Sequence, residues 1–304
     1  MKFLALLTAL LLEQARPLRY PNWLEVLFVR YARYLVRQFD GGEYRHGVLA
    51  WMLAVAPPVV LVGAVFLALH QVSALAAWLW SVLVLYITMG LRQFSHHFTE
   101  ISEALRESRL DEARDRLGRW QRSGTAGLEV GAIARAAIKL ALLASHRHVF
   151  GAIAWFLVAG APGAVLYRFA ATLAERWDAG AGASAFGRFA ANAFFWIDWL
   201  PARLTAASFA IAGNFEDAVY CWRTQAPSWE GEASGVILAS GGGALGVRLG
   251  GAPGVGGGPQ IQPELGLGDE ADADYMRSAV GLVWRALVLW MVLVLAVTIA
   301  YALG

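Results

Sequence analysis

The chain has 304 residues, of which 58% are hydrophobic and only 16% are charged. A soluble domain contains about 45–50% apolar and about 25% charged residues, so this composition excludes an ordinary soluble core and indicates a protein that uses the lipid bilayer as solvent. The formal net charge of +2 excludes the basic footprint of a nucleic-acid-binding protein, and the single cysteine, Cys221, excludes an intrachain disulfide framework and a multi-cysteine metal site.

The N-terminal region combines a short apolar segment with a basic arm. Phe3 to Leu12 is apolar but shorter than the about 20 residues that cross a bilayer. No small-residue cleavage pattern follows it, so we predict a retained, partly inserted helix rather than a signal peptide. Glu13 to Gly47 and Arg92 to His148 are rich in arginine, and the positive-inside rule places both stretches in the cytoplasm.

Four segments are apolar enough to be predicted as membrane spans. Val48 to Leu69 and Val72 to Leu91 form a helical hairpin, and Pro57-Pro58 predicts a kink in its first helix. Phe150 to Leu173 and Ala286 to Leu303 are the other two spans.

Two further segments bear on the fold. Phe189 to Gly213 is apolar on average but contains charged residues and a proline. It is therefore re-entrant, interfacial, or a polar span that faces the bundle interior. Ser102 to Gln121 has an apolar stripe on an otherwise charged surface, which predicts one soluble helix.

The predicted fold is an all-α integral membrane protein. It is a helical bundle with about four to six membrane segments and a charged extramembrane helical region. One membrane segment is kinked, and another either crosses the bilayer or is re-entrant. The chain is predicted to divide into five regions. These are an N-terminal helix and basic arm (1–47), a transmembrane hairpin (48–91), a cytoplasmic charged region (92–148), a motif-bearing region (149–278) and a C-terminal transmembrane helix (279–304).

Short motifs follow one another in the second half of the chain. Gly160 to Ala164 reads Gly-Ala-Pro-Gly-Ala and precedes Tyr167-Arg168. Trp199 to Leu204 reads Trp-Leu-Pro-Ala-Arg-Leu. Gly243 to Gly251 reads Gly-Ala-Leu-Gly-Val-Arg-Leu-Gly-Gly, and Leu267 to Asp269 reads Leu-Gly-Asp. In this order the motifs resemble the CobD/CbiB–AmpE superfamily of inner-membrane proteins. That superfamily carries Gly-Ala-Pro…Tyr-Lys, Tyr-Leu-Pro-Ala-Arg-Leu and Gly-Ala-Leu-Gly…Leu-Gly-Gly…Gly-Asp.

The resemblance implies one of two functions. Cobalamin-biosynthesis members join adenosylcobyric acid to an aminopropanol phosphate, an amide-forming step associated with ATP and a divalent metal. AmpE-like members are linked to β-lactamase regulation and have no firmly assigned chemistry. Their Asp-Trp-Val-Pro-Val-Arg-Leu stretch is similar to Asp198 to Leu204 of this chain.

Acidic elements of the enzymatic members are missing from the matching positions. Their Glu-x-x-x-Glu-Asn-x-x-Asp-Gly element falls at Leu142 to Gly151, their Asn-Thr-x-Asp-x-Met element at Ala171 to Arg176, and their Asp-Asp pair at Phe194-Phe195. Aliphatic and aromatic side chains do not bind Mg²⁺. We therefore expect a non-catalytic protein with an AmpE-like regulatory, signalling or scaffolding role. The alternative is an adenosylcobinamide-phosphate synthase-type enzyme that uses ATP and Mg²⁺.

The candidate site has no catalytic residue under this hypothesis. Asp198 and Arg203 form an internal ion pair or contact a ligand, because an isolated charge in an apolar setting is costly. The glycine run is either a flexible loop or an altered anion site. The ligand-binding candidates are Asp198, Arg203, Arg168, Gly243, Gly246, Arg248, Gly250 and Gly251. Asp269, within an acidic cluster that precedes the last helix, is the metal candidate.

The cofactor is left open, since Mg²⁺ and ATP belong only to the enzyme alternative. The expected partners are the lipid bilayer and a membrane or cell-wall-signalling protein, with no nucleic acid and with oligomerisation left open. The expected location is the bacterial inner membrane, crossed several times.

Overall fold

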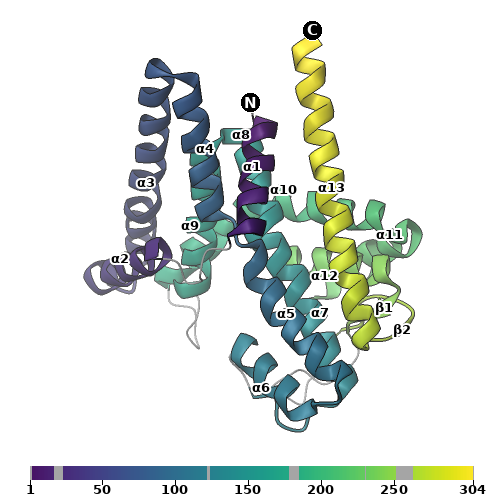
Figure 1. Ribbon diagram of the computed structural model, residues 1–304. Helices are drawn as coiled ribbons and strands as arrows, with labels where there is room; N and C mark the ends of the chain where they lie inside the picture. Colours follow the sequence, from purple (N-terminus) through teal and green to yellow (C-terminus); the bar gives the residue numbers. More distant parts are fainter. Residues whose placement is uncertain are drawn as a thin grey trace. The chain divides into compact units, whose positions relative to one another are not determined.

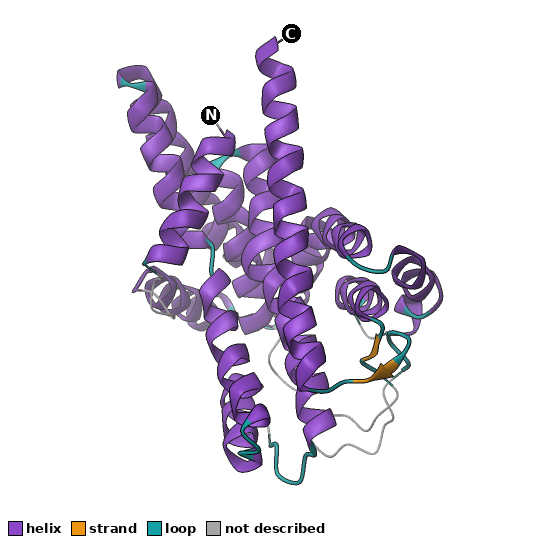
Figure 2. Ribbon diagram, turned by 45° about the vertical axis from the view of Figure 1, so that its right-hand side comes forward, coloured by secondary structure: helices purple, strands orange, loops and turns teal. Residues whose placement is uncertain are grey.

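The computed structural model describes residues 2–16, 23–121, 124–177, 185–229, 231–250 and 263–303, and almost all of them are helical (Figures 1 and 2). The chain divides into two compact units, and each is described by itself. Unit 1 comprises Met1–Gly90, Arg147–Pro201 and Thr298–Gly304, and unit 2 comprises Leu91–His146 and Ala202–Val297. This all-α architecture confirms the predicted fold class.

Unit 1 is built on helices that pack along the predicted hairpin. Its elements are α1 (Lys2–Ala15), α2 (Trp23–Phe39), α3 (Tyr44–Val72), α4 (Ala74–Thr88), the π-helical turn η1 (His146–Phe150), α8 (Gly151–Ala159) and α9 (Ala161–Trp177). Helix α1 packs against α4 and buries Ala5, Leu6 and Ala9, so it is part of the fold of this unit. Ala161, Val165 and Val84 form a buried cluster where α9 meets α4.

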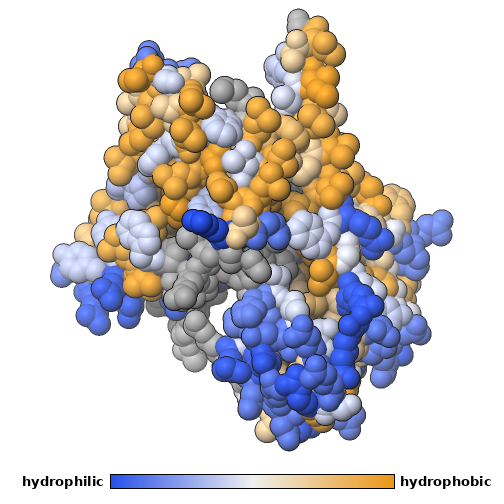
Figure 3. Space-filling model, in the orientation of Figure 1, coloured by the Kyte–Doolittle hydropathy of each residue, from blue (hydrophilic) through white to orange (hydrophobic). Residues whose placement is uncertain are grey.

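Among the described residues, three helical stretches are long and apolar enough to cross a membrane: Tyr44–Val72, Val130–Ala159 and Ala273–Leu303. The first contains Pro57 and Pro58 within a continuous helix. Helix α4 is apolar but has only 15 residues. Apolar side chains cover the visible surface of α3 and α4 (Figure 3).

The predicted span from Phe150 to Leu173 is wrong. Gly160 ends α8 with a φ of +68°, a conformation that side chains with a Cβ rarely adopt, and α9 begins at Ala161. The long apolar stretch instead joins α7 to α8, because the π-turn η1 continues the helix between them. The sequence did not predict this stretch as a span because Arg135, Lys139 and Arg147 lower its mean hydropathy.

Unit 2 contains most of the charged helices and the short β-ladder. Its elements are α5 (Leu91–Arg106), α6 (Leu110–Gln121), α7 (Val130–Ser145), α11 (Phe215–Thr224), the 3-10 turn η2 (Ala226–Ser228), α12 (Glu232–Leu245), β1 (Val247–Arg248) and β2 (Asp269–Glu270). Helix α10 (Ala185–Ala212) passes from unit 1 into unit 2 after Pro201, and α13 (Ala273–Leu303) passes into unit 1 after Val297. The membrane position of α10 stays a prediction, although the segment is one continuous helix.

The predicted single helix from Ser102 to Gln121 is also wrong. Helix α5 ends at Arg106, and Ser108 adopts a positive φ of 57° in the turn that leads into α6. The two helices pack together and bury Leu105, Ala113 and Leu117, so the stripe forms the contact between two short helices. The expected apolar face exists, but a reversal divides it.

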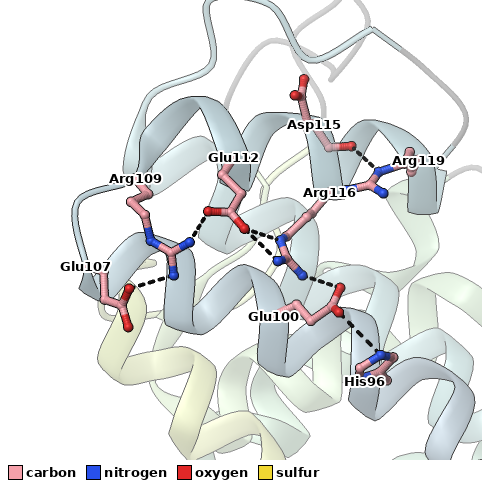
Figure 4. Close-up of polar contacts among 8 residues, drawn as sticks. All are labelled: His96, Glu100, Glu107, Arg109, Glu112, Asp115, Arg116 and Arg119. Atoms are coloured by element: carbon pink, nitrogen blue, oxygen red, sulfur yellow. Dashed lines mark hydrogen bonds and ion pairs between the residues drawn. The ribbon is translucent and has the colours of Figure 1, made fainter.

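Charged side chains link α5 to α6 (Figure 4). Glu112 accepts hydrogen bonds from Arg109 and Arg116, and Arg116 also pairs with Glu100. The hydrogen bond from Arg116 lowers the pKa of the Glu112 carboxyl. The network surrounds the small apolar contact with ion pairs, which are weak individually at an exposed surface.

The glycine run begins as helix rather than as the expected loop. Gly241 to Gly243 belong to α12, and their backbones are buried. Gly246 then caps the helix in the left-handed conformation, with its N–H donating to the carbonyls of Gly242 and Gly243. Strands β1 and β2 follow as a parallel ladder that pairs Val247 with Asp269 and Arg248 with Glu270 (Figure 2).

Candidate functional site: a glycine-walled polar cavity

The residues of the Gly-Ala-Leu-Gly…Leu-Gly-Asp run fold into two backbone segments in close contact in unit 2. A Cβ on Gly250 would lie 2.0 Å from the Pro263 carbonyl oxygen, and one on Gly268 would lie 2.2 Å from that of Gly246. Only glycine permits these approaches. The N–H of Leu249 donates to the carbonyl of Leu265 over 2.6 Å, so the segments are also hydrogen-bonded to each other.

A glutamine fixes the same region from the outside. The Gln225 side chain accepts a hydrogen bond from the N–H of Gly266 at 2.7 Å and donates one to its carbonyl at 3.3 Å. Because both backbone groups of Gly266 are used, the position of this turn is set relative to η2, which follows Gln225. The segment after the glycine run is therefore positioned by hydrogen bonds as well as by packing.

These segments line a polar cavity of about 470 Å³ that is partly open to solvent, which we call the glycine-walled cavity. Among the described residues, its charged lining residues are Arg135 from α7, Arg248 from β1, Glu264, and Glu270 from β2, and Gly250 and residues 265–268 also line it. Arg248, Glu264 and Glu270 are exposed. The cavity thus gathers two guanidinium and two carboxylate groups around a small volume.

The two arginines of the cavity lining differ in how open they are to a ligand. The Nε of Arg135 is buried and has no hydrogen-bond partner within the described part of the chain. Arg248 has no ion pair with any described residue, although Glu270 is its register partner in the ladder. The Arg135 Nε has almost no accessible surface, so a ligand in the cavity does not reach it, whereas the exposed Arg248 is open to one.

Asp269 lies next to this cavity but has a structural contact. Its carboxylate accepts a hydrogen bond of 2.8 Å from the hydroxyl of Tyr275. Asp272 accepts hydrogen bonds from the N–H groups of Asp274 and Tyr275, so it caps the start of α13. No group of three or more His, Cys, Asp or Glu able to hold a metal occurs among the described residues, and the metal role of Asp269 stays a prediction.

A second polar cluster is buried in unit 1. The Tyr167 hydroxyl donates to Asp198 over 2.8 Å, and these residues are 0% and 3% exposed. A Cβ on Gly151 would lie 2.1 Å from the Tyr167 ring, so a glycine at this position makes room for the tyrosine. The Gly-Ala-Pro…Tyr-Arg motif therefore starts α9 and delivers a hydroxyl to a buried carboxylate.

Arg168 contacts both a histidine and a glutamate in this unit. One guanidinium nitrogen lies 2.6 Å from Nδ1 of His148, and another lies 3.5 Å from a carboxylate oxygen of Glu25. Glu25 and Arg168 also border a mostly apolar cavity of about 270 Å³. This arrangement links the first turn of α2 to the middle of α9.

The predicted site residues are divided between the two units. Gly243, Gly246, Arg248, Gly250 and Asp269 lie together in unit 2, whereas Arg168 and Asp198 lie in unit 1, and Gly251 lies outside the described residues.

Arg203 forms an ion pair with Glu232 at the start of α12. Asp198 and Arg203 fall in different units, and their mutual ion pair stays a prediction.

Sequence reasoning missed Arg135, Glu264, Glu270 and Tyr167. Arg135 gave a usable signal, since a charged residue within the apolar run from Val130 to Ser145 is costly unless it is paired or serves a site. The two glutamates gave none, because their role depends on the return of the chain after residue 262.

The fold is that of a helical membrane protein with a small polar cavity lined by residues of both charges. The family model for CobD/Cbib protein matches residues 3–283, and the chain belongs to the CobD/CbiB family. It is 37% identical to a protein of Stutzerimonas stutzeri over 305 residues, which cover 96% of this chain and 97% of the relative. It is 40% identical to a protein of Chromobacterium violaceum over 72% of this chain and 70% of the relative.

Both relatives bear the name "Cobalamin biosynthesis protein CobD", as does a Leptospira interrogans protein that is 26% identical over 65% of this chain. No solved structure matches the chain.

The expected non-catalytic, AmpE-like role is therefore wrong. Relatives named for cobalamin biosynthesis resemble nearly the whole chain, and none of the reported names points to regulation. The inference failed because it equated the loss of carboxylates at particular sequence positions with the loss of a polar site. Packing brings Arg135, Glu264 and Glu270 together from segments that the motif comparison did not include.

Proposed function

We propose that this protein is a membrane enzyme of cobalamin biosynthesis that joins adenosylcobyric acid to an aminopropanol phosphate through an amide bond. The main support for this proposal is the 37% identity to the Stutzerimonas stutzeri protein over 96% of the chain. We place the enzyme in the bacterial inner membrane, crossed several times, because three described helical stretches are long and apolar enough to span a bilayer.

The glycine-walled cavity supports a reaction with a small charged substrate. Its volume of about 470 Å³ lies within the range of small-ligand sites. Arg135 and Arg248 offer planar donors suited to phosphate oxygens, and Glu264 and Glu270 offer acceptors for an ammonium group. The role of this chain is then to bind and orient the amine substrate for attack on the corrinoid carboxyl group.

Amide formation from an acid and an amine releases water, so the carboxyl group needs activation, which ATP with Mg²⁺ would supply. The described residues do not by themselves gather three metal-binding side chains. Mg²⁺ often uses one or two carboxylates together with substrate phosphates and water. Dependence on Mg²⁺ and ATP is therefore part of the proposal rather than of the described site.

Complementation tests the proposed function. A bacterial strain without its native synthase receives this gene and is grown on cobyric acid under conditions that require cobalamin. Rescue by the wild-type chain supports the proposal, and cobinamide, which already contains the amide, serves as the positive control. Growth on cobinamide but not on cobyric acid, with the protein present in the membrane, would contradict it.

Purified protein gives the direct assay. Formation of the corrinoid amide from cobyric acid is followed by mass spectrometry with and without ATP and Mg²⁺. Arg248→Gln is compared with Arg277→Gln, a matched change at an exposed arginine of α13 outside the cavity lining. We expect loss of activity with the first variant and full activity with the second.

A further inference from the structure

The exposed face of helix α2 in unit 1 combines arginines with aromatic side chains. Helix α2 runs from Trp23 to Phe39 and packs against α3. We propose that this face binds the headgroups of anionic phospholipids, so that α2 lies in the membrane interface beside the N-terminal half of α3. The proposal concerns a surface of unit 1 and does not depend on the proposed reaction.

The buried side of α2 determines which side chains are left exposed. Phe28, Ala32 and Leu35 are buried, and their spacing of four and three residues places them on one face of the helix. The ring of Phe28 stacks on that of Phe169 in α9, with the ring centroids 3.8 Å apart. This side of α2 is therefore fixed against the rest of unit 1, and the opposite side faces the surroundings.

The exposed side of α2 has two edges with different chemistry. The basic edge consists of three exposed arginines, Arg30, Arg33 and Arg37. The aromatic edge consists of four other exposed residues, Trp23, Leu27, Tyr31 and Tyr34. At about 100° of rotation per residue, each edge covers less than about a quarter of the helix circumference, and the two edges adjoin. Positive charge and aromatic surface are thus separated along the length of one helix.

The charges of the basic edge are not neutralised within the described part of the chain. No ion pair joins its three arginines to another described residue. The single carboxylate within α2, that of Glu25, lies 3.5 Å from a guanidinium nitrogen of Arg168. Asp40 follows the helix, and its carboxylate accepts a hydrogen bond from the N–H of Gly42. Three positive charges within about two helical turns therefore fit a surface of phosphate groups.

The aromatic edge continues into the apolar surface of α3. The hydroxyl of Tyr31 donates to the carbonyl of Leu53 over 3.1 Å, and Leu49, Met52 and Leu53 are themselves exposed. Helix α2 lies at the lower end of α3, and hydrophilic side chains gather below the apolar surface of α3 at this corner (Figures 1 and 3). Trp and Tyr favour the headgroup region, and arginine on an amphipathic helix contacts anionic lipid.

This continuity favours lipid over a soluble acidic partner. A bilayer that covers the exposed residues of α3 also reaches the adjoining aromatic edge. A soluble protein would have to displace that lipid in order to contact both edges of α2. Anionic headgroups are the partner that satisfies the basic edge and the aromatic edge together.

Native mass spectrometry of the full-length protein in detergent tests the proposal. The probes are phosphatidylglycerol, which is anionic, and phosphatidylcholine with the same acyl chains, which has no net charge. Inorganic phosphate is added as a competitor to distinguish a lipid headgroup from a free anion. The same spectra report the oligomeric state of the protein.

Two variants separate clustered charge from total charge. The charge variant carries Arg30→Gln, Arg33→Gln and Arg37→Gln. The control variant also removes three exposed arginines, but from α6, α11 and α13 of unit 2, by Arg119→Gln, Arg223→Gln and Arg277→Gln. A third variant replaces the three arginines of the basic edge with lysine and so keeps the charge. Thermal unfolding in detergent checks that each variant is folded.

We expect the wild-type protein to bind phosphatidylglycerol more tightly than phosphatidylcholine. The charge variant should reduce this preference on the order of tenfold or more, because each basic residue near an anionic surface contributes separately. The control variant and the lysine variant should keep the preference. Trp23→Ala with Leu27→Ala should weaken both lipids alike, because it removes apolar contact and leaves the charge unchanged.

Several results would overturn the proposal. One is equal affinity of the wild-type protein for both lipids, and another is an unchanged preference in the charge variant. Loss of the preference in the control variant would show that net charge alone is responsible. Displacement of phosphatidylglycerol by inorganic phosphate would assign the basic edge to a free anion. A dimer that dissociates only in the charge variant would assign it to a second copy of the chain.

Discussion

The contact of Gly250 with the segment that begins at Pro263 offers a sharp test of how the cavity wall is built. In Gly250→Ala the new Cβ would lie 2.0 Å from the Pro263 carbonyl oxygen and 2.5 Å from the backbone nitrogen of Leu265. Backbone atoms cannot rotate away as the end of a side chain can, so the two segments must separate. Separation lengthens the hydrogen bonds from the N–H groups of Leu249 and Gly250 to the Leu265 carbonyl, now 2.6 and 3.2 Å.

The cost follows from these contacts. Overpacking of a close contact costs about 1–3 kcal/mol, and each weakened backbone hydrogen bond adds about 0.5–1.5 kcal/mol. We expect Gly250→Ala to lower the free energy of unfolding by about 2–4 kcal/mol. The assay is thermal unfolding in detergent followed by intrinsic tryptophan fluorescence, with a drop in Tm on the order of 5 °C or more.

Gly281 provides the matched control for this substitution. It lies within α13, and a Cβ there would meet nothing within 4 Å. Gly281→Ala is expected to be neutral or to stabilise the protein by up to about 1 kcal/mol, because alanine is the better helix former. If Gly250→Ala unfolds at the same temperature as the wild-type protein and Gly281→Ala, then the close approach does not support the cavity.

Three further outcomes follow from other contacts. Tyr167→Phe removes the donor to buried Asp198 and should lower stability by about 1–2 kcal/mol in chemical unfolding, whereas the same change at exposed Tyr301 should have no effect. Gly160→Ala should cost about 1–3 kcal/mol in that assay, because a φ of +68° with a ψ of −153° is strained for alanine; an unchanged midpoint would contradict this. Partial desolvation of the largely exposed His97 lowers its pKa below the usual 6.5. The unfolded chain therefore binds the proton more readily, and the α5–α6 contact should lose a small part of its stability as pH falls from 7 to 5. Amide hydrogen exchange of residues 95–121, corrected for intrinsic rates, would show this loss, and His97→Gln should reduce it; equal protection at both pH values would refute the assignment.

Much of the fold could be predicted from hydropathy and helix signals. The long apolar segments that became α3 and α13 were visible in the sequence because an isolated helix needs only its own length and apolar surface to be stable in a bilayer. The break at Gly160 was missed because glycine and proline also occur within membrane helices. Its effect depends on the positive φ that packing imposes, as at Ser108 between α5 and α6.

The sequence by itself determined the class of protein and the family, since composition and ordered motifs depend only on the residues and their spacing. It also located two residues of the cavity lining, Arg248 and Gly250. Only the tertiary structure decided which charges complete that lining. Arg135 precedes Arg248 by more than a hundred residues, and no local pattern indicates that the two meet, because a contact between distant segments is set by packing and hydrogen bonds rather than by periodicity.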